Sequence, residues 1–282
     1  MPTGPLQDTP SSRFGDTQSG GTSSETLAGK AAIVTGASRG IGRSIALRLA
    51  RDGAKLFLVA RTQSALDSVA GEIAAAGGSA TALAADLRDP EVPAAVVEAA
   101  LGAYGVIDIL VNNAGATRRG DFLELTDDDW MDGFALKFFG AVRLVRAAWP
   151  HLKRSRGCIL NIVGIGGRTP GAEFTIGGSV NGACLSFTKA LADVGIRDGV
   201  QVNAINPGWV RTDRLRTLLK TSAEQLSGDM EAAVKKVVQQ SNIVRLGEPE
   251  DVANLAAFVL SPEGRLLQGS LIDLDGGQTK TL

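Results

Sequence analysis

Short apolar runs alternate along the chain with segments whose apolar residues recur every three or four positions. The apolar runs have strand length, and the helical spacing after the first run is carried by Ile41, Ile45 and Leu49. The predicted strands begin at residue 31 and then span residues 55–60, 80–85, 107–111, 158–163, 200–205 and 270–274. The predicted helices cover residues 41–49, 63–76, 91–101, 127–153, 178–198 and 249–260. This alternation predicts a single α/β domain.

Strands that alternate with helices are joined by right-handed crossovers and therefore run parallel. We expect one Rossmann-like, doubly wound domain over residues 27–282, with about seven parallel strands and helices on both faces. Residues 1–26 are rich in Ser, Thr, Gly and Pro and lack apolar periodicity, which indicates a disordered arm or an artificial extension. Residues 214–244 are helical but poorly patterned. We interpret them as a substrate lid, with a plain surface insertion as the alternative.

Charge and cysteine content narrow the function classes. The 29 Lys and Arg residues nearly balance the 30 Asp and Glu residues, so no global field favours nucleic acid or a membrane surface. No apolar run approaches the ~18–20 residues that span a bilayer, and no basic-then-apolar leader is present. Cys158 and Cys184 lie in apolar surroundings, where a buried thiol is more common than a disulfide. We expect a cytoplasmic protein without nucleic-acid or membrane partners and without a metal site.

The run from Ala31 ends in a turn with three glycines, Gly36, Gly40 and Gly42, before the first helix. Glycine lets the backbone turn tightly and approach an anion closely, while the first N–H groups of the helix offer unpaired donors. The pattern fits a pyrophosphate, although a bare glycine triplet is also common in ordinary strand-to-helix turns.

Five ordered motifs resemble the short-chain dehydrogenase/reductase family over about residues 27–277. They are Thr35-Gly-Ala-Ser-Arg-Gly-Ile-Gly42, Asp86 after the third strand, Asn112-Asn-Ala-Gly115, Pro207-Gly208 with Thr212, and Arg245-Leu-Gly-Glu-Pro-Glu-Asp-Val252 leading to Asp275-Gly-Gly277. The 3-oxoacyl-carrier-protein reductase-like members are the expected nearest relatives. The resemblance implies a small-molecule substrate and a homo-oligomer, either a dimer or a tetramer.

The resemblance also implies a nicotinamide cofactor and the residues that bind it. These are Gly36, Ser38, Arg39, Gly40, Ile41, Gly42, Asp86, Leu87, Asn113, Ala114, Gly115, Pro207, Gly208, Val210 and Thr212, and Arg61 joins them because of its charge. Asp86 is expected to accept from the exocyclic amine of the adenine, with a helix cap before Pro90 as the alternative. An acidic residue after the second strand would accept from the ribose hydroxyls, but Ala60 stands there, followed by Arg61. Arg39 and Arg61 favour the 2′-phosphate of NADP(H) over NAD(H), unless both are only solvated surface charges.

The family's catalytic Asn, Ser, Tyr and Lys are all absent at the aligned positions. Lys137, Gly164, Gly177 and Asn181 occupy those positions, and the single tyrosine, Tyr104, precedes the fourth strand. Asn and Lys have therefore exchanged places, and Lys137 is predicted to bring its ammonium near the ribose with Asn181 as its hydrogen-bond partner. The alternative is a solvated Lys137.

Other candidates for proton transfer are weaker. Glu173 and Thr175 lie near the expected mouth of the site, and His151 lies near a helix end, where a surface role is expected. Three functions remain open. An NADP(H)-dependent oxidoreductase on a carbonyl/alcohol pair is favoured over a cofactor-binding sensor or scaffold without turnover and over a non-redox enzyme.

Overall fold

The computed structural model describes residues 26–225 and 228–280, so the predicted N-terminal arm lies outside the described residues except for Thr26. The strands are β1 (Ala31–Thr35), β2 (Lys55–Ala60), β3 (Ser79–Ala84), β4 (Ile109–Asn112), β5 (Cys158–Ile162), β6 (Gln201–Pro207) and β7 (Leu271–Leu274). The helices are α1 (Gly40–Arg51), α2 (Gln63–Ala75), α3 (Val92–Tyr104), α4 (Asp127–Phe134), α5 (Gly140–Ser155), α6 (Thr175–Asp198), α7 (Asp213–Gln225), α8 (Met230–Ser241) and α9 (Pro249–Leu260).

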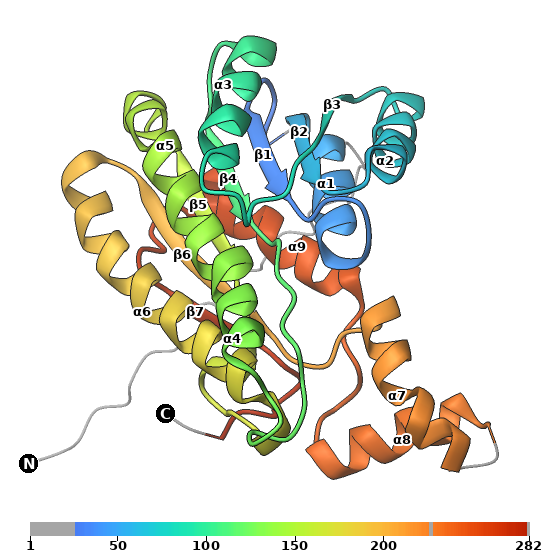
Figure 1. Cartoon of the computed structure of the whole chain (residues 1–282). Coiled ribbons are helices and arrows are strands. Elements are labelled where there is room, and N and C mark those ends of the chain that lie inside the picture. The colour runs from blue at the N-terminus through green and yellow to red at the C-terminus, as the bar shows by residue number, and fades with distance from the viewer. Residues whose placement is uncertain (1–25, 226–227, 281–282) are drawn as a thin grey trace, which may run out of the picture.

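All seven strands form one parallel sheet in the order β3-β2-β1-β4-β5-β6-β7. The strand order reverses between β1 and β4 (Figure 1). In doubly wound sheets the ligand crevice lies beyond the carboxyl ends of the strands at such a reversal. The predicted Rossmann-like, doubly wound fold is confirmed.

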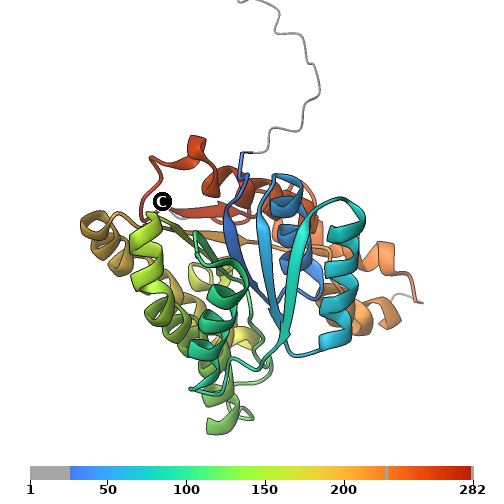
Figure 2. The same cartoon turned by 90° about the horizontal axis from the view of Figure 1, so that it is seen from above.

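Helices cover both faces of the sheet (Figure 2). Side chains from α1, α2 and α9 pack on one face around Ile45, Leu66 and Val252, and each of these is fully buried. Side chains from α3, α5 and α6 pack on the other face, where Val96 and Leu144 are fully buried. The strands read as continuous apolar runs because both of their faces are covered.

The predicted helix over residues 127–153 differs from the structure at its middle. A five-residue π-helical turn, Ala135–Phe139, separates α4 from α5 and carries Lys137. A π turn inserts one extra residue per turn and is frequent at functional sites. Helix α6 starts at Thr175, three residues before the predicted start at residue 178, so Gly177 also belongs to this helix.

Helices α7 and α8 form a pair that stands apart from the sheet at the lower right of Figure 1. The pair has its own apolar cluster, in which Leu215, Leu219 and Ala233 are buried with Ile243 and Leu246. This cluster explains the poor helical pattern, because each short helix buries its apolar side against the other rather than against the sheet.

The two cysteines and the single tyrosine are packed in the interior or against the backbone. Cys158 and Cys184 are buried free thiols, and burial raises the pKa of each. Tyr104 donates from its hydroxyl to the carbonyl oxygen of Leu56 at 2.8 Å, which fixes it in a packing role. Among residues 26–225 and 228–280, no helix is long and apolar enough to cross a membrane, and no cluster of His, Cys, Asp and Glu could hold a metal.

Candidate active site

The glycine turn lies at the carboxyl end of β1, in the crevice where the strand order reverses. Gly36 and Gly40 have φ values of 64° and 52°, which favour glycine. A Cβ at Gly42 would lie 2.2 Å from the carbonyl oxygen of Gly36, so no side chain fits there. No side chain caps the N-terminus of α1 at Arg39. The first N–H groups of α1 are therefore not used by a cap and can meet a phosphate.

Thr35 and Asn113 hold the second turn against the glycine turn. Thr35 Oγ1 accepts from the backbone N–H of Asn113 at 2.9 Å and of Ala114 at 3.0 Å. Asn113 Nδ2 donates to the carbonyl oxygen of Thr35 at 2.9 Å. Sequence reasoning gave Thr35 no role of its own, although it opens the quoted motif. Its hydroxyl joins β1 to the loop after β4.

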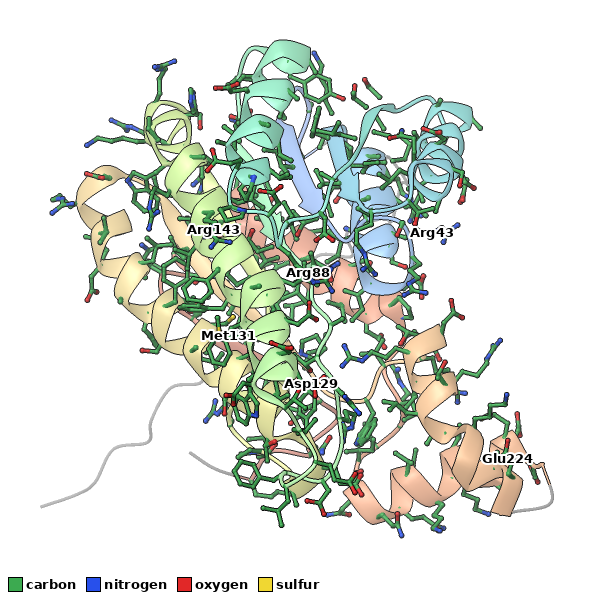
Figure 3. The ribbon with its side chains drawn as sticks, in the orientation of Figure 1. Arg43, Arg88, Asp129, Met131, Arg143 and Glu224 are labelled. Carbon is green, nitrogen blue, oxygen red and sulfur yellow. The ribbon has the colours of Figure 1, made fainter. Side chains whose placement is uncertain are left out.

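Asp86 is not the helix cap that served as the alternative interpretation, because Asp89 accepts from the N–H of Glu91 instead. The Asp86 carboxylate accepts from the backbone N–H of Arg88 at 3.1 Å and from its guanidinium at 3.0 Å. Arg88 also donates to Asp132 on α4. Figure 3 shows Arg88 between α1 and the helices α4 and α5. Leu87 is buried in the core beside this loop.

The remaining residues of the expected cofactor site border the same crevice. Thr212 Cγ2 would lie 3.3 Å from a Cβ at Gly40, so the loop after β6 reaches the glycine turn. Gly208 donates its backbone N–H to the carbonyl oxygen of Leu274 at 3.0 Å, and Val210 bridges to Gly247. Of the remaining members of the set, Ser38 lies in the glycine turn, Ile41 in the first turn of α1 and Pro207 at the end of β6. Arg39 and Arg61 are exposed, and neither has an ion pair within the described part of the chain.

The Lys137 side chain is held by two hydrogen bonds beside the crevice. Its ammonium donates to Val163 O at 2.5 Å and to Asn181 Oδ1 at 2.6 Å. Its side chain passes over Gly115, where a Cβ would lie 2.8 Å from Lys137 Cδ. The hydrogen bond expected between the exchanged residues is present. A freely solvated Lys137, the alternative interpretation, is wrong.

Burial is the main cause that lowers the pKa of Lys137, to about 8, from an ordinary value of 10.5. The charge of Arg214 lowers this pKa further, while Cys184 raises it. A lysine has three N–H donors, and two of them are used by Val163 and Asn181. An amine that titrates near neutral pH and keeps one free donor is suited to proton transfer.

The positions of the family's Ser and Tyr are closed by the backbone and by Phe174. Gly164 has φ 122° and ψ 145°, a conformation that a serine would adopt only with strain. A Cβ at Gly177 would lie 2.0 Å from Phe174 Cε2. The ring also lies against Gly166, where a Cβ would be 2.8 Å from Cε1. Phe174 thus fills the space beside Gly177, a role that sequence reasoning missed.

The other proton-transfer candidates make few contacts with this cluster. Glu173 is exposed and contributes its carbonyl oxygen to the N–H of Gly120 at 3.1 Å. Thr175 Oγ1 is buried without a hydrogen-bond partner in the described structure. His151 lies on α5 just before its last turn, which ends at Ser155, so it is near the helix end as expected. The structure does not bring His151 to the other candidates.

Known proteins share both the sequence and the fold of this chain. The model of the short chain dehydrogenase family matches residues 30–223. An oxidoreductase of Mycobacterium tuberculosis is 37% identical, over 89% of this chain and 92% of the relative. The oxidoreductase UcpA of Escherichia coli is 36% identical, over 90% and 95%. L-sorbose reductase from Gluconobacter frateurii, in complex with NADPH and L-sorbose, has a TM-score of 0.87 at 34% identity, over 90% and 98%.

Proposed function

The chain belongs to the short chain dehydrogenase family, and from that premise we propose that it transfers a hydride between NADP(H) and a carbonyl or alcohol substrate, with Lys137 as its proton-transfer group. The observation that carries the proposal is the Lys137 ammonium, which two acceptors hold beside the crevice with a pKa of about 8. The likeness to 3-oxoacyl-carrier-protein reductases and the homo-oligomeric state remain predictions.

The crevice fits a dinucleotide on its own geometry. Its glycine turn leaves no space for a Cβ at Gly42, and the uncapped start of α1 leaves its first N–H groups available to a phosphate. Asn113 to Gly115 would pass beside the cofactor, Asp86 and Leu87 would receive the adenine, and Thr212 would hold the carboxamide. L-sorbose reductase, solved with NADPH, supports the choice of cofactor. When bound, the nicotinamide supplies or accepts the hydride.

A residue of the chain must supply the proton in reduction and accept it in oxidation. Tyrosine is the family's general acid, and here Phe174 fills the space at Gly177. Lys137 carries an exchangeable proton, and its remaining N–H is not used by Val163 or Asn181. In reduction Lys137 would donate this proton to the substrate oxygen, and in oxidation the neutral amine would accept it. The helix pair α7 and α8 would cover the substrate as a lid.

Deuterium transfer tests this function directly. The protein is incubated with NADPH carrying deuterium at C4 and with a panel of aldehydes and ketones, and the products are analysed by mass spectrometry. We expect deuterium in at least one alcohol. Binding of NADPH without deuterated product across the panel would favour a sensor or scaffold. Product formation without nicotinamide oxidation would favour a non-redox enzyme.

Arg39 and Arg61 are predicted to set the preference for NADP(H). Both are exposed near the glycine turn and the end of β2, and a guanidinium binds a phosphate in two places at once. Arg39→Ala and Arg61→Ala are each expected to weaken NADPH binding about 10-fold, because a charge-assisted hydrogen bond is lost, while NADH binding stays within about twofold.

Arg43→Ala is the matched control for this measurement. Arg43 lies on α1 close to the turn, but its guanidinium pairs with Glu72 on α2. We expect no change in the ratio of NADPH to NADH dissociation constants, measured by fluorescence titration. A ratio equally unchanged in the Arg39 and Arg61 variants would contradict the assignment.

A further inference from the structure

Most arginines near the carboxyl edge of the sheet have a carboxylate partner. The pairs are Arg88 with Asp86 and Asp132, Arg118 with Asp129, Arg168 with Asp273, Arg211 with Glu248, and Arg245 with Asp251. Arg119 and Arg214 differ from these. Within residues 26–225 and 228–280, neither guanidinium has an ion pair or a hydrogen bond. These two positive charges are therefore not neutralised by an ion pair.

Arg119 is held in place by an aromatic ring. Its Cζ lies 4.5 Å from the centroid of the Phe174 ring, and that ring is fixed in turn against Gly166 and Gly177. A guanidinium that stacks on a ring keeps its N–H groups free, because they point outward in its own plane. Arg119 thus presents donors at the position beside Gly177, where the family has its tyrosine.

Arg214 brings a second guanidinium from another element. It lies in the first turn of α7, and its residue surface is exposed, so a ligand can reach it. Its charge lowers the pKa of Lys137, and the charge of Arg119 lowers the pKa of Arg214. Thr212, two residues before Arg214, reaches the glycine turn at Gly40, so the start of α7 lies at the crevice. The electrostatic effects agree with this placement. The carboxylate that acts on Arg119 is that of Glu173, which forms no ion pair with it.

Arg214 lowers the pKa of Lys137 and Arg119 lowers the pKa of Arg214, so like charges repel one another at this place. An anion between them would relieve this repulsion. Arginine pairs bind carboxylate and phosphate groups with parallel hydrogen bonds, which gives both affinity and orientation. The Phe174 ring adds an apolar surface beside the same place.

We propose that Arg119 and Arg214 bind an anionic group of the substrate, a carboxylate or a phosphate, and that the substrate is therefore a negatively charged carbonyl or alcohol compound. This inference rests on the proposed function for its reaction, but the anion site itself is testable without turnover. The family resemblance assigns no such site, and neither arginine belongs to the expected cofactor set.

Equilibrium binding is the first test. The NADP⁺-saturated protein is titrated by calorimetry with benzoate, with inorganic phosphate and with the neutral analogue benzamide. We expect benzoate to bind at least 10-fold more tightly than benzamide. Arg119→Met and Arg214→Met should each weaken benzoate binding about 10- to 100-fold. Arg119→Gln and Arg214→Gln serve as second variants, and circular dichroism checks the fold of each.

Matched controls lie on the same elements. Arg118 precedes Arg119 in the loop but pairs with Asp129, and Arg216 is exposed on α7. Arg118→Met and Arg216→Met should leave benzoate binding within twofold. Affinity for NADP⁺ should also stay within twofold in the Arg119 and Arg214 variants. A loss of NADP⁺ affinity with unchanged benzoate binding would assign the arginines to the cofactor and overturn the proposal.

Turnover provides the second test and separates the two proposals. Phenylglyoxylate and its methyl ester differ in one charge, and kcat/KM is measured for both. Arg119→Met should lower kcat/KM for the acid at least 10-fold and leave the ester within twofold. Equal losses for both, or failure of benzoate and phosphate to bind the wild-type protein, would overturn the anion site. Arginine-dependent benzoate binding without reduction of any carbonyl would uphold the anion site and reject the proposed function.

Discussion

Replacing Lys137 with methionine is expected to lower kcat for carbonyl reduction about 10²–10⁴-fold, the range that a general acid contributes. Methionine keeps the length of the side chain that passes over Gly115 but cannot donate to Val163 or Asn181. NADPH affinity should also fall, since the ammonium is expected beside the ribose. Steady-state kinetics and NADPH titration measure both effects.

The control is Lys189→Met on α6, an exposed lysine that should leave kcat and NADPH affinity within twofold. A Lys137→Met variant with unchanged kcat and unchanged NADPH affinity would remove Lys137 from the site. In that case water or the substrate itself would have to supply the proton.

The pH profile gives the same prediction a second readout. Because the pKa of Lys137 is about 8, the ammonium needed for reduction is lost above that pH, so kcat/KM for reduction should decline. For oxidation the neutral amine is needed, and kcat/KM should rise through the same pH. Burial is the main cause of this low pKa, with Arg214 adding to it. Lys137→Met should abolish both limbs.

The free energy of unfolding should also depend on pH through Lys137, because burial lowers the pKa of this lysine in the folded state. The pKa of Lys137 is lowered in the folded state, so between about pH 8 and 10.5 the unfolded chain binds more protons than the folded one. The contribution of Lys137 to the free energy of unfolding therefore rises with pH through that window. Urea unfolding at both ends of the window should show a smaller rise for Lys137→Met than for the wild type.

The fold could be predicted because both faces of the sheet are covered. Strands buried on both sides read as continuous apolar runs, and the helices between them keep a helical spacing of apolar residues. The glycine turn was equally readable, since Gly36, Gly40 and Gly42 are each required by backbone geometry. The pairing of Lys137 with Asn181 followed from the alignment of two helices that face one another.

The rest of the site depends on groups that meet only in space. Phe174 reaches the position beside Gly177 from a short 3₁₀ turn, which no periodicity marks. The φ of 122° at Gly164 could not be predicted, because the chain has many glycines and the sequence does not show which of them need a positive φ. Arg119 and Arg214 come from a loop and from α7, about a hundred positions apart. Their lack of carboxylate partners emerges only when the surrounding ion pairs are known.

The exchange of Lys and Asn between the two helices predicts a large effect on stability. Asn181 is 3% exposed and accepts from the Lys137 ammonium at 2.6 Å. Asn181→Lys would place a second ammonium against the first, with the acceptor removed. A buried charge without a partner costs about 3–5 kcal/mol of unfolding free energy, or roughly 6–20 °C in Tm for a domain of this size.

The double variant Lys137→Asn with Asn181→Lys should restore most of this loss, because one ammonium again faces one amide. We expect its free energy of unfolding within about 2 kcal/mol of the wild type, measured by urea denaturation in a double-mutant cycle. The double variant should not reach the activity of family members that have the catalytic tyrosine. Phe174 still fills the space beside Gly177, and Gly164 keeps a backbone conformation that favours glycine. Additive losses in the double variant would contradict a direct Lys137–Asn181 pair. Recovery of stability with full activity would instead mean that only the ammonium matters, whichever helix carries it.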